Sequence, residues 1–162
     1  KQNPQLTLFK TIVAVIAVVA VLVLVAFIYD KATDWKDYKS YDHLKTYDQV
    51  LSQEQENYVV YFYGTNALSV ELKEDALRVL NGLRKDQMIY LVNTNDFAEK
   101  QVENESDKYN RQKLLTDLGI DSIISPLIVV VVDGELEEVI SGTININKFL
   151  KSLDNDTYEP FN

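Results

Sequence analysis

Few side chains in this sequence could carry out covalent or redox chemistry. The chain has 162 residues, no cysteine and one histidine, His43. Without a thiol there can be no disulfide, no thiolate metal site and no thiol catalysis. Ser69 lies in the turn that follows a predicted strand, but no base stands near it in the sequence, so we interpret it as a helix N-cap and not as a nucleophile.

The remaining titratable side chains do not form a recognisable catalytic or metal-binding pattern. The 25 acidic residues are scattered, and His43 is interpreted as an ordinary surface residue on a solvated helix. The oxygen-rich loop at residues 93–105 lacks the ligand order of an EF-hand. We therefore predict no catalytic residue, no cofactor and no metal site.

The longest apolar stretch, residues 11–28, contains no charge, glycine or proline. A helix of that length rises about 27 Å, close to the roughly 30 Å hydrocarbon core of a bilayer. We predict a transmembrane helix over residues 11–29, after an N-terminal arm at residues 1–10, that acts as an uncleaved signal anchor. A cleaved signal peptide is the rival interpretation, but its apolar region usually has about 7–15 residues and ends at a small-x-small site, which is missing here.

The segment after the span is predicted to be a charged juxtamembrane linker, residues 30–40, with Tyr29 and Trp35 at the membrane interface. Residues 30–162 carry 14 basic and 25 acidic side chains, a formal charge of −11, because two of the 16 basic residues precede the span. Such a domain repels phosphate backbones and anionic lipid head groups. Nucleic acid is therefore not an expected partner.

Hydrophobic periodicity predicts alternating helices and strands after the linker. The predicted strands are residues 58–63, 88–92, 127–132 and 137–140, and the predicted helices are residues 41–55, 72–83, 114–118 and 146–153. Strand–helix–strand order implies a parallel pair, and Asp133-Gly134 between the last two strands implies a hairpin. We predict an α/β domain over residues 41–153, with a mixed sheet flanked by helices, and a C-terminal tail at residues 154–162.

Two segments in this order resemble the thioredoxin fold. The strand "YVVYFY" and its turn resemble the first strand and active-site turn of thioredoxin-like proteins from Gram-positive bacteria, including bacteriocin transport accessory proteins. The stretch "SPLIVVVVDGELEEVISG" resembles the family's cis-proline, strand, turn, strand and glycine segment. The resemblance covers residues 41–153 and implies a cis peptide bond between Ser125 and Pro126.

The resemblance places Ala67 and Val70 where the two redox cysteines would stand, and Tyr61 where many thioredoxins carry a buried acid. The redox chemistry is therefore lost, while the groove beside the turn, which in the family binds extended peptide, could remain. The residues that would form this surface are Asn66, Ala67, Leu68, Ser69, Ser125 and Pro126.

These observations predict a bacterial, redox-inactive, membrane-anchored thioredoxin-like binding module, and not an enzyme. We expect an accessory subunit or adaptor of a membrane protein complex, whose partner is an integral membrane protein or complex and whose domain is extracytoplasmic. A chaperone-like binder of extended or unfolded polypeptide is the alternative, and an enzyme with a non-thiol site is a weaker one. The turn could also be a disused active site without a partner.

Overall fold

The structure, a computed structural model, describes residues 4–34, 36–84, 88–99 and 105–161, so the predicted interfacial Trp35 lies outside the described residues. The chain forms two compact units, residues 1–34 and 35–162.

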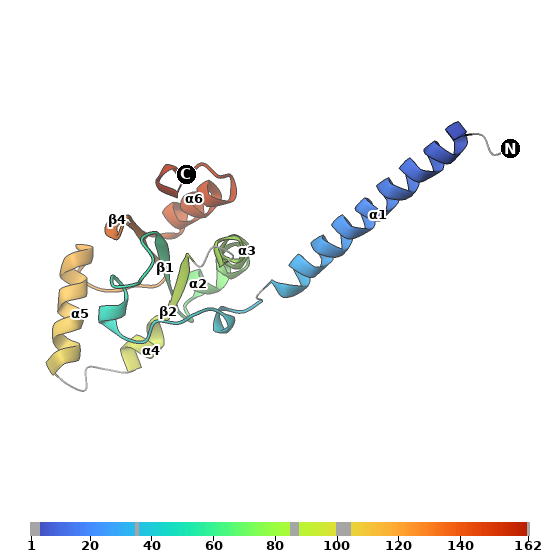
Figure 1. The fold of residues 1–162 in the computed structure, drawn as a ribbon. Coiled ribbons are helices and arrows are strands. Elements are labelled where there is room, and N and C mark those ends of the chain that lie inside the picture. Colours follow the sequence, from blue (N-terminus) through green and yellow to red (C-terminus); the bar gives the residue numbers. More distant parts are fainter. Residues whose placement is uncertain (1–3, 35, 85–87, 100–104, 162) are drawn as a thin grey trace. The chain divides into compact units, whose positions relative to one another are not determined.

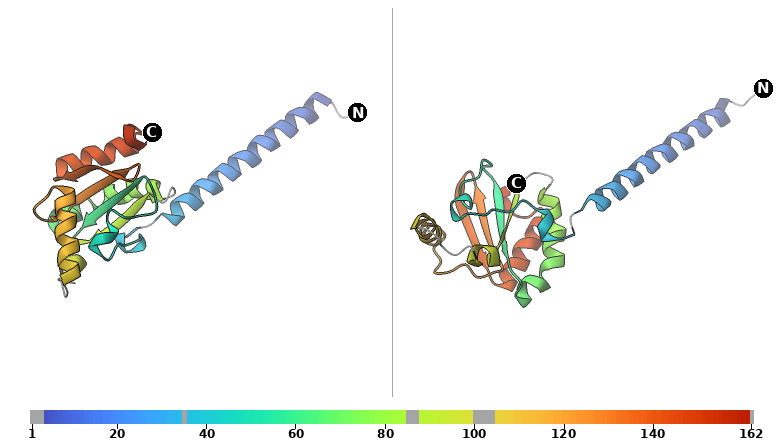
Figure 2. Two further views of the ribbon diagram at one scale, coloured as in Figure 1. Left: turned by 60° about the vertical axis from the view of Figure 1, so that its left-hand side comes forward. Right: turned by 90° about the horizontal axis from the view of Figure 1, so that it is seen from below.

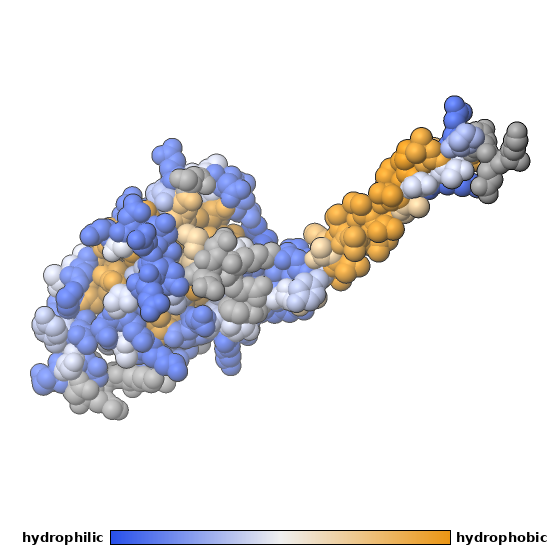
Figure 3. Space-filling model, viewed as in Figure 1, coloured by the Kyte–Doolittle hydropathy of each residue, from blue (hydrophilic) through white to orange (hydrophobic). Residues whose placement is uncertain are grey.

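The first unit is the helix α1 (Pro4–Thr33). Its side chains are exposed, and its surface is hydrophobic except near its ends (Figure 3). By length and composition α1 could cross a membrane, and these are also properties of an N-terminal signal sequence.

The second unit is built on a four-stranded mixed sheet in the order β2-β1-β3-β4 (Figure 1). The strands are β1 (Tyr58–Tyr63), β2 (Ile89–Asn93), β3 (Leu127–Val132) and β4 (Glu135–Ser141). Strand β1 pairs in parallel with β2 and antiparallel with β3, and β3 pairs antiparallel with β4. The predicted fold class is confirmed: this is a thioredoxin-like mixed sheet flanked by helices.

Helices cover both faces of this sheet (Figure 2). They are α2 (Ala67–Glu71), α3 (Lys73–Arg84), α4 (Thr94–Glu99), α5 (Glu105–Leu118) and α6 (Thr143–Asp154). Alternate residues of β1 point to opposite faces, so Val59 and Tyr61 pack with α3 and α6, whereas Val60 and Phe62 pack with α5. The sheet is therefore buried on both sides, which explains why β1 and β3 are continuous apolar runs.

The turns that the sequence predicts are present. Asp133 and Gly134 both have positive φ, 53° and 76°, as a two-residue type I′ hairpin requires. Gly119 ends α5 with φ 67°, and the Ile120 N–H donates to the Leu115 carbonyl at 3.1 Å, which closes the helix end.

The predicted helix over residues 41–55 is wrong. This segment instead runs along the outer edge of β2, where the Leu44 N–H donates to the Leu91 carbonyl at 2.9 Å and the Leu91 N–H donates to the Asp42 carbonyl at 2.8 Å. Two short 3₁₀ turns, η1 (Tyr38–Ser40) and η2 (Tyr47–Gln49), lie on either side of this bridge. Pairing with an open sheet edge satisfied these backbone groups, and this outweighed the helical spacing of the apolar residues.

The linker and the tail also differ from the sequence interpretation. Helix α1 continues to Thr33, and Tyr38, inside the predicted linker, is only 4% exposed and belongs to the core. At the other end, Phe161 lies in the turn η3 (Glu159–Phe161), and Tyr158 directly precedes this turn. Both side chains pack against the core, and the Tyr158 ring lies between those of Phe149 and Phe161. Tyr38 of the predicted linker and Tyr158 and Phe161 of the predicted tail are therefore parts of the folded unit.

Candidate functional site

Four loops leave the sheet from one edge. The parallel strands β1 and β2 end there at Tyr63 and Asn93. Phe62 is paired with Leu127, the first residue of β3, and Leu127 is paired with Ser141, the last residue of β4. The loops after β1, β2 and β4, and the loop before β3, therefore meet at this edge, which we call the loop edge. The active-site turn and the Ser125-Pro126 segment that the sequence predicts both belong to it.

The turn after β1 is capped by Asn66 and not, as predicted, by Ser69. The Asn66 Oδ1 accepts a hydrogen bond from the Ser69 N–H at 2.9 Å, which caps α2. Ser69 is 1% exposed, and its Oγ accepts from the Gly64 N–H at 3.2 Å. Its hydroxyl thus fixes the inside of the turn, and it is not a surface group that could contact a ligand.

Asn66 also ties the turn to the proline loop. Its Nδ2 donates to the Ser125 carbonyl at 2.5 Å and to the Ser125 Oγ at 3.3 Å. The Ser125-Pro126 peptide bond is cis, as the resemblance implied. Gly64 allows this close approach, because a Cβ on it would lie 2.5 Å from the Ser125 Oγ. We call the contact between Asn66 and Ser125 the latch.

The six predicted binding residues lie at the loop edge, but they divide into two groups. Asn66, Ala67 and Leu68 are exposed, whereas Ser69, Ser125 and Pro126 are buried. The structure adds three exposed apolar side chains that the sequence interpretation did not include: Val70, Ile124 and Ile144, which are 62%, 70% and 83% exposed. The sequence held a signal for two of them, because Ile124 adjoins Ser125 and Ile144 follows the glycine that ends β4.

Tyr61, which the resemblance places where many thioredoxins carry a buried acid, lies in the core on β1. Tyr61 is fully buried, and its hydroxyl oxygen lies 3.3 Å from that of Tyr38. The two rings meet edge to face, with their centres 5.5 Å apart. Burial raises the pKa of both phenols, so both are neutral near pH 7. Lys73 lies 5.8 Å over the Tyr38 ring and pairs with Asp37 at 3.4 Å. The side chain at position 61 is therefore a neutral phenol and not a carboxyl group.

The site cannot perform thiol–disulfide exchange with its own side chains. Both redox positions are exposed, but they hold Ala67 and Val70, and the sequence contains no cysteine. Within the described residues, no group of three histidine, aspartate or glutamate side chains could hold a metal ion.

His43 is not the solvated helical residue that the sequence interpretation made it. It is half-buried, and its Nδ1 lies 2.7 Å from the Tyr41 carbonyl. Because a carbonyl only accepts, Nδ1 carries the proton, and in the neutral ring Nε2 accepts from the Tyr63 hydroxyl at 2.7 Å. Burial, followed by the charges of Asp96 and Asp37, raises the pKa of Tyr63 to about 12, so its hydroxyl keeps its proton.

Comparison with known proteins gives a likeness only to solved structures. No family model and no curated protein matches the chain. Thioredoxin f2 of Chlamydomonas reinhardtii is 19% identical over 72% of this chain and 95% of that one, with a TM-score of 0.46. Malassezia sympodialis thioredoxin is 13% identical over 72% and 90%, with a TM-score of 0.46. Mitochondrial thioredoxin 3 of Saccharomyces cerevisiae is 13% identical over 71% and 97%, with a TM-score of 0.43. At this similarity we base the thioredoxin-like fold on the strand order and the cis-proline loop of the chain itself.

Proposed function

We propose that the chain is a membrane-anchored binding module that acts as an accessory subunit or adaptor of a membrane protein complex. In this proposal α1 is a single-pass signal anchor, the thioredoxin-like domain is extracytoplasmic, and the partner is an integral membrane protein or complex. The length and composition of α1 support the anchor. The absence of cysteine supports binding and not redox catalysis as the role of the domain.

The apolar surface at the loop edge is the observation that carries the proposal. Leu68 and Val70 on α2 are 44% and 62% exposed, and Ile124 beside the proline loop is 70% exposed. Ile144, at the start of α6, is the most exposed of the four at 83%. Exposed apolar side chains on loops that meet at one edge of a sheet are candidates for protein contact, because burying them is what drives association.

The latch favours a partner with a preformed surface over an extended chain. A peptide that binds as an added strand gains its affinity from main-chain hydrogen bonds. At the loop edge, the Ser125 carbonyl already accepts from Asn66. A partner that packs folded side chains against Leu68 and Ile124 would not need that carbonyl. The chaperone-like binder therefore remains the second candidate, with less support.

We also propose that the chain is not an enzyme. Ser69, the hydroxyl between the two former redox positions, is buried and held by the Gly64 N–H. His43, the one histidine, is bonded at both ring nitrogens to Tyr41 and Tyr63 and has no serine beside it in these contacts. A nucleophile and a base within reach of each other are the minimum for covalent hydrolytic chemistry.

The test is a pull-down of the tagged full-length chain from membranes in mild detergent. The variant Leu68→Asp with Ile124→Asp places two charges in the apolar surface, and Tyr109→Asp, at a 68% exposed residue of α5, is the matched control. We expect one stoichiometric membrane partner with the native chain and with the control, and its loss with the double variant.

Three other outcomes would reject parts of the proposal. A partner that stays bound to the double variant would place the contact outside the loop edge. Many substoichiometric polypeptides in place of one partner would favour the chaperone-like binder. If nothing co-purifies with the native chain, the accessory-subunit proposal fails.

A further inference from the structure

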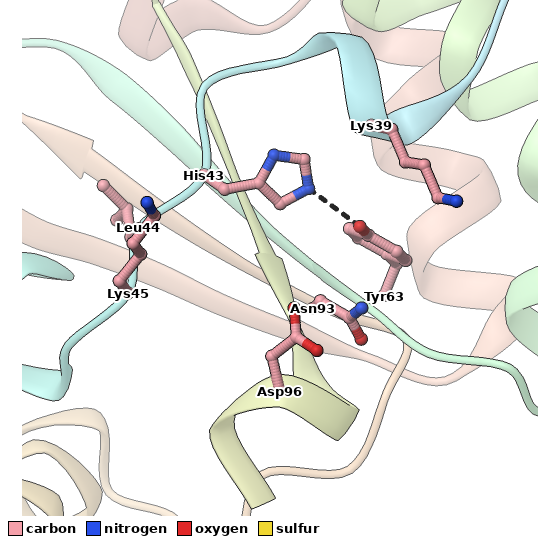
Figure 4. Close-up of a pocket in the computed structure, with 7 residues that line it drawn as sticks. All are labelled: Lys39, His43, Leu44, Lys45, Tyr63, Asn93 and Asp96. Carbon is pink, nitrogen blue, oxygen red and sulfur yellow. Dashed lines mark hydrogen bonds between the residues drawn. The ribbon is translucent and has the colours of Figure 1, made fainter. Parts of the chain in front are cut away.

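The two side edges of the sheet differ in what covers them. At the β2 edge, the backbones of Asp42 and Leu44 already pair with Leu91. His43, which lies between these two residues, is bonded to Tyr63 (Figure 4). At the other edge, β4 pairs with β3, and among the described residues no backbone hydrogen bond joins β4 to any other segment. An open edge strand presents a row of N–H and C=O groups that can pair with the backbone of another chain.

The pairing pattern determines which backbone groups of β4 point outward. In β1, the Val59 N–H donates to the Met88 carbonyl at 2.7 Å, so the backbone groups of Val59 face β2 and those of Val60 face β3. Val60 is paired with Val129, and Val129 is paired with Val139. Because the direction of the backbone groups alternates between the pairs of an antiparallel ladder, Val139 turns its N–H and C=O away from β3. Both groups are therefore directed to the open edge.

The side chains of β4 give this edge a negative charge. Glu135, Glu137 and Glu138 are exposed, and in the described part of the chain none of them forms an ion pair. Leu136 and Val139 belong to the core on the α5 side of the sheet, whereas Glu138 lies beside α6. Like charges opposite each other destabilise a sheet, so this edge disfavours an acidic strand, including a second copy of β4, and favours a basic one.

A polar cavity of about 400 Å³ lies between β4 and α6. Its volume is within the range of pockets that bind small ligands, roughly 300–1,000 Å³, so it has room for a long side chain. The polar side chains that line it include Glu138 and Ser141 of β4, Lys148 and Ser152 of α6, and Tyr158. The cavity thus adjoins the open edge, where a side chain of an added strand could enter it.

One polar group at this cavity has no partner. The Tyr158 hydroxyl is buried and forms no hydrogen bond within the part of the chain that the structure describes. Burial, followed by the charges of Glu138 and Glu137, raises the pKa of Tyr158 to about 12, so the hydroxyl keeps its proton near pH 7. A buried polar group without a partner costs free energy. An ammonium or guanidinium beside Glu138 could donate to the phenol oxygen and would remove that cost.

From the open edge, its charge and the adjoining cavity we infer that β4 binds an extended, basic segment of a partner polypeptide as an added strand. The backbone of Val139 provides main-chain pairing, and lysine or arginine at every second position of the segment faces the glutamates. One of these side chains enters the cavity beside Glu138 and Tyr158. Lys148 also lines the cavity but belongs to α6, so the acidic wall is the one that β4 forms. The inference goes beyond the proposed partner surface at the loop edge and does not depend on it.

The test measures the binding of a fluorescent peptide to the full-length chain in non-ionic detergent by anisotropy. The peptide is as long as β4 and alternates lysine with threonine. Of two comparison peptides, one has glutamate in place of lysine. The other keeps the lysines but carries a methyl group on every backbone amide, which removes the N–H donors that an added strand needs.

Three variants and one control locate the bound peptide. The triple variant Glu135→Gln, Glu137→Gln and Glu138→Gln removes the charge of β4. Its control makes the same change at three exposed glutamates outside β4, Glu54, Glu71 and Glu74. Tyr158→Phe removes the hydroxyl that has no partner. Leu68→Ser with Ile124→Ser alters the loop edge without adding charge.

We expect the lysine peptide to bind the native chain saturably, to bind the triple variant about tenfold more weakly, and to bind Tyr158→Phe severalfold more weakly. The triple control and the loop-edge variant should bind it as the native chain does, and neither comparison peptide should bind. If the methylated peptide binds as tightly as the unmodified one, binding rests on charge alone and the inference is overturned. It is also overturned if the native chain does not bind the lysine peptide, if the triple variant behaves like its control, if Tyr158→Phe binds like the native chain, or if the loop-edge variant loses the peptide.

Discussion

Replacing Asn66 by alanine should both destabilise the domain and open the loop edge to extended peptide. The asparagine makes two separate contributions in the structure. Its Oδ1 caps α2 by accepting from the Ser69 N–H at 2.9 Å, and its Nδ2 forms the latch with Ser125. Alanine removes both, whereas Asn66→Asp keeps the cap oxygen and removes the donor of the latch. The pair of variants therefore separates the two contributions.

The magnitudes follow from the two contacts. Loss of an N-cap typically costs about 1 kcal/mol, and loss of a hydrogen bond to a partly buried carbonyl costs about 1 kcal/mol more. We expect Asn66→Ala to lower the free energy of unfolding by about 2 kcal/mol, and Asn66→Asp to lower it by about 1 kcal/mol. Both are measured by urea unfolding of the full-length chain in detergent, followed by tyrosine fluorescence.

The binding consequence is a gain of function. In Asn66→Ala the Ser125 carbonyl is free to accept from the backbone of a peptide, and one such bond, at about 1 kcal/mol, corresponds to about fivefold in affinity. Fluorescence anisotropy with an unfolded apolar peptide should therefore show tighter binding to Asn66→Ala than to the native chain. If the native chain already binds the peptide equally well, the latch does not exclude extended chains, and the chaperone-like function gains support. If Asn66→Ala is as stable as the native chain, the latch is not formed.

Three further predictions test the same edge of the sheet. Gly64→Ala should lower the free energy of unfolding by about 1 kcal/mol, because its Cβ would lie 2.5 Å from the Ser125 Oγ. Adding Ser125→Ala to this variant should restore most of the lost stability. If the single and the double variant are equally stable, the close approach between Gly64 and Ser125 is contradicted. The double variant Ala67→Cys with Val70→Cys should form an internal disulfide, since residues three apart are neighbours on a helix. Mass spectrometry would show the loss of two hydrogens. A stable dithiol would contradict the placement of the two redox positions at residues 67 and 70. The pKa of Tyr63 is raised from 10.0 to about 12, so its contribution to stability is complete below pH 10 and is lost as the pH rises toward 12, because the unfolded chain releases the phenolic proton first. An alkaline titration of the tyrosines should show a late-titrating phenol that the variant Tyr63→Phe removes. A titration without such a phenol would contradict the prediction.

The sequence was sufficient for most of the sheet and for the helices α3 and α6. It was not sufficient for α4, which lies within the predicted oxygen-rich loop, or for the first nine residues of α5. The strand over residues 58–63 and the strand over residues 127–132 match β1 and β3 because both are short, continuous apolar runs between turn residues. The segment at residues 41–55 was not predictable in the same way. Its apolar spacing suits a helix, and only the presence of an open edge on β2 makes pairing the better arrangement.

The site was predictable as a place and not as a set of contacts. The turn and the Ser125-Pro126 loop could be located, but the latch joins residues 59 positions apart, and the His43–Tyr63 bond joins residues 20 positions apart. Local patterns carry no information on such pairs. Side-chain exposure failed for the same reason: Ser69 looks like a surface cap in the sequence, while the fold turns its hydroxyl inward to the Gly64 N–H.

The loss of the redox site and the ordering of the segment after α1 occur at the same place in the fold. Tyr61, at the position of the buried acid, has the phenol of Tyr38 as its polar contact. Tyr38 is flanked by the pair between Asp37 and Lys73, and the next turn of chain is held by His43 on Tyr63. The phenol pair that stands where thioredoxins resembling this chain carry an acid is thus part of the same aromatic packing that fixes the start of the domain.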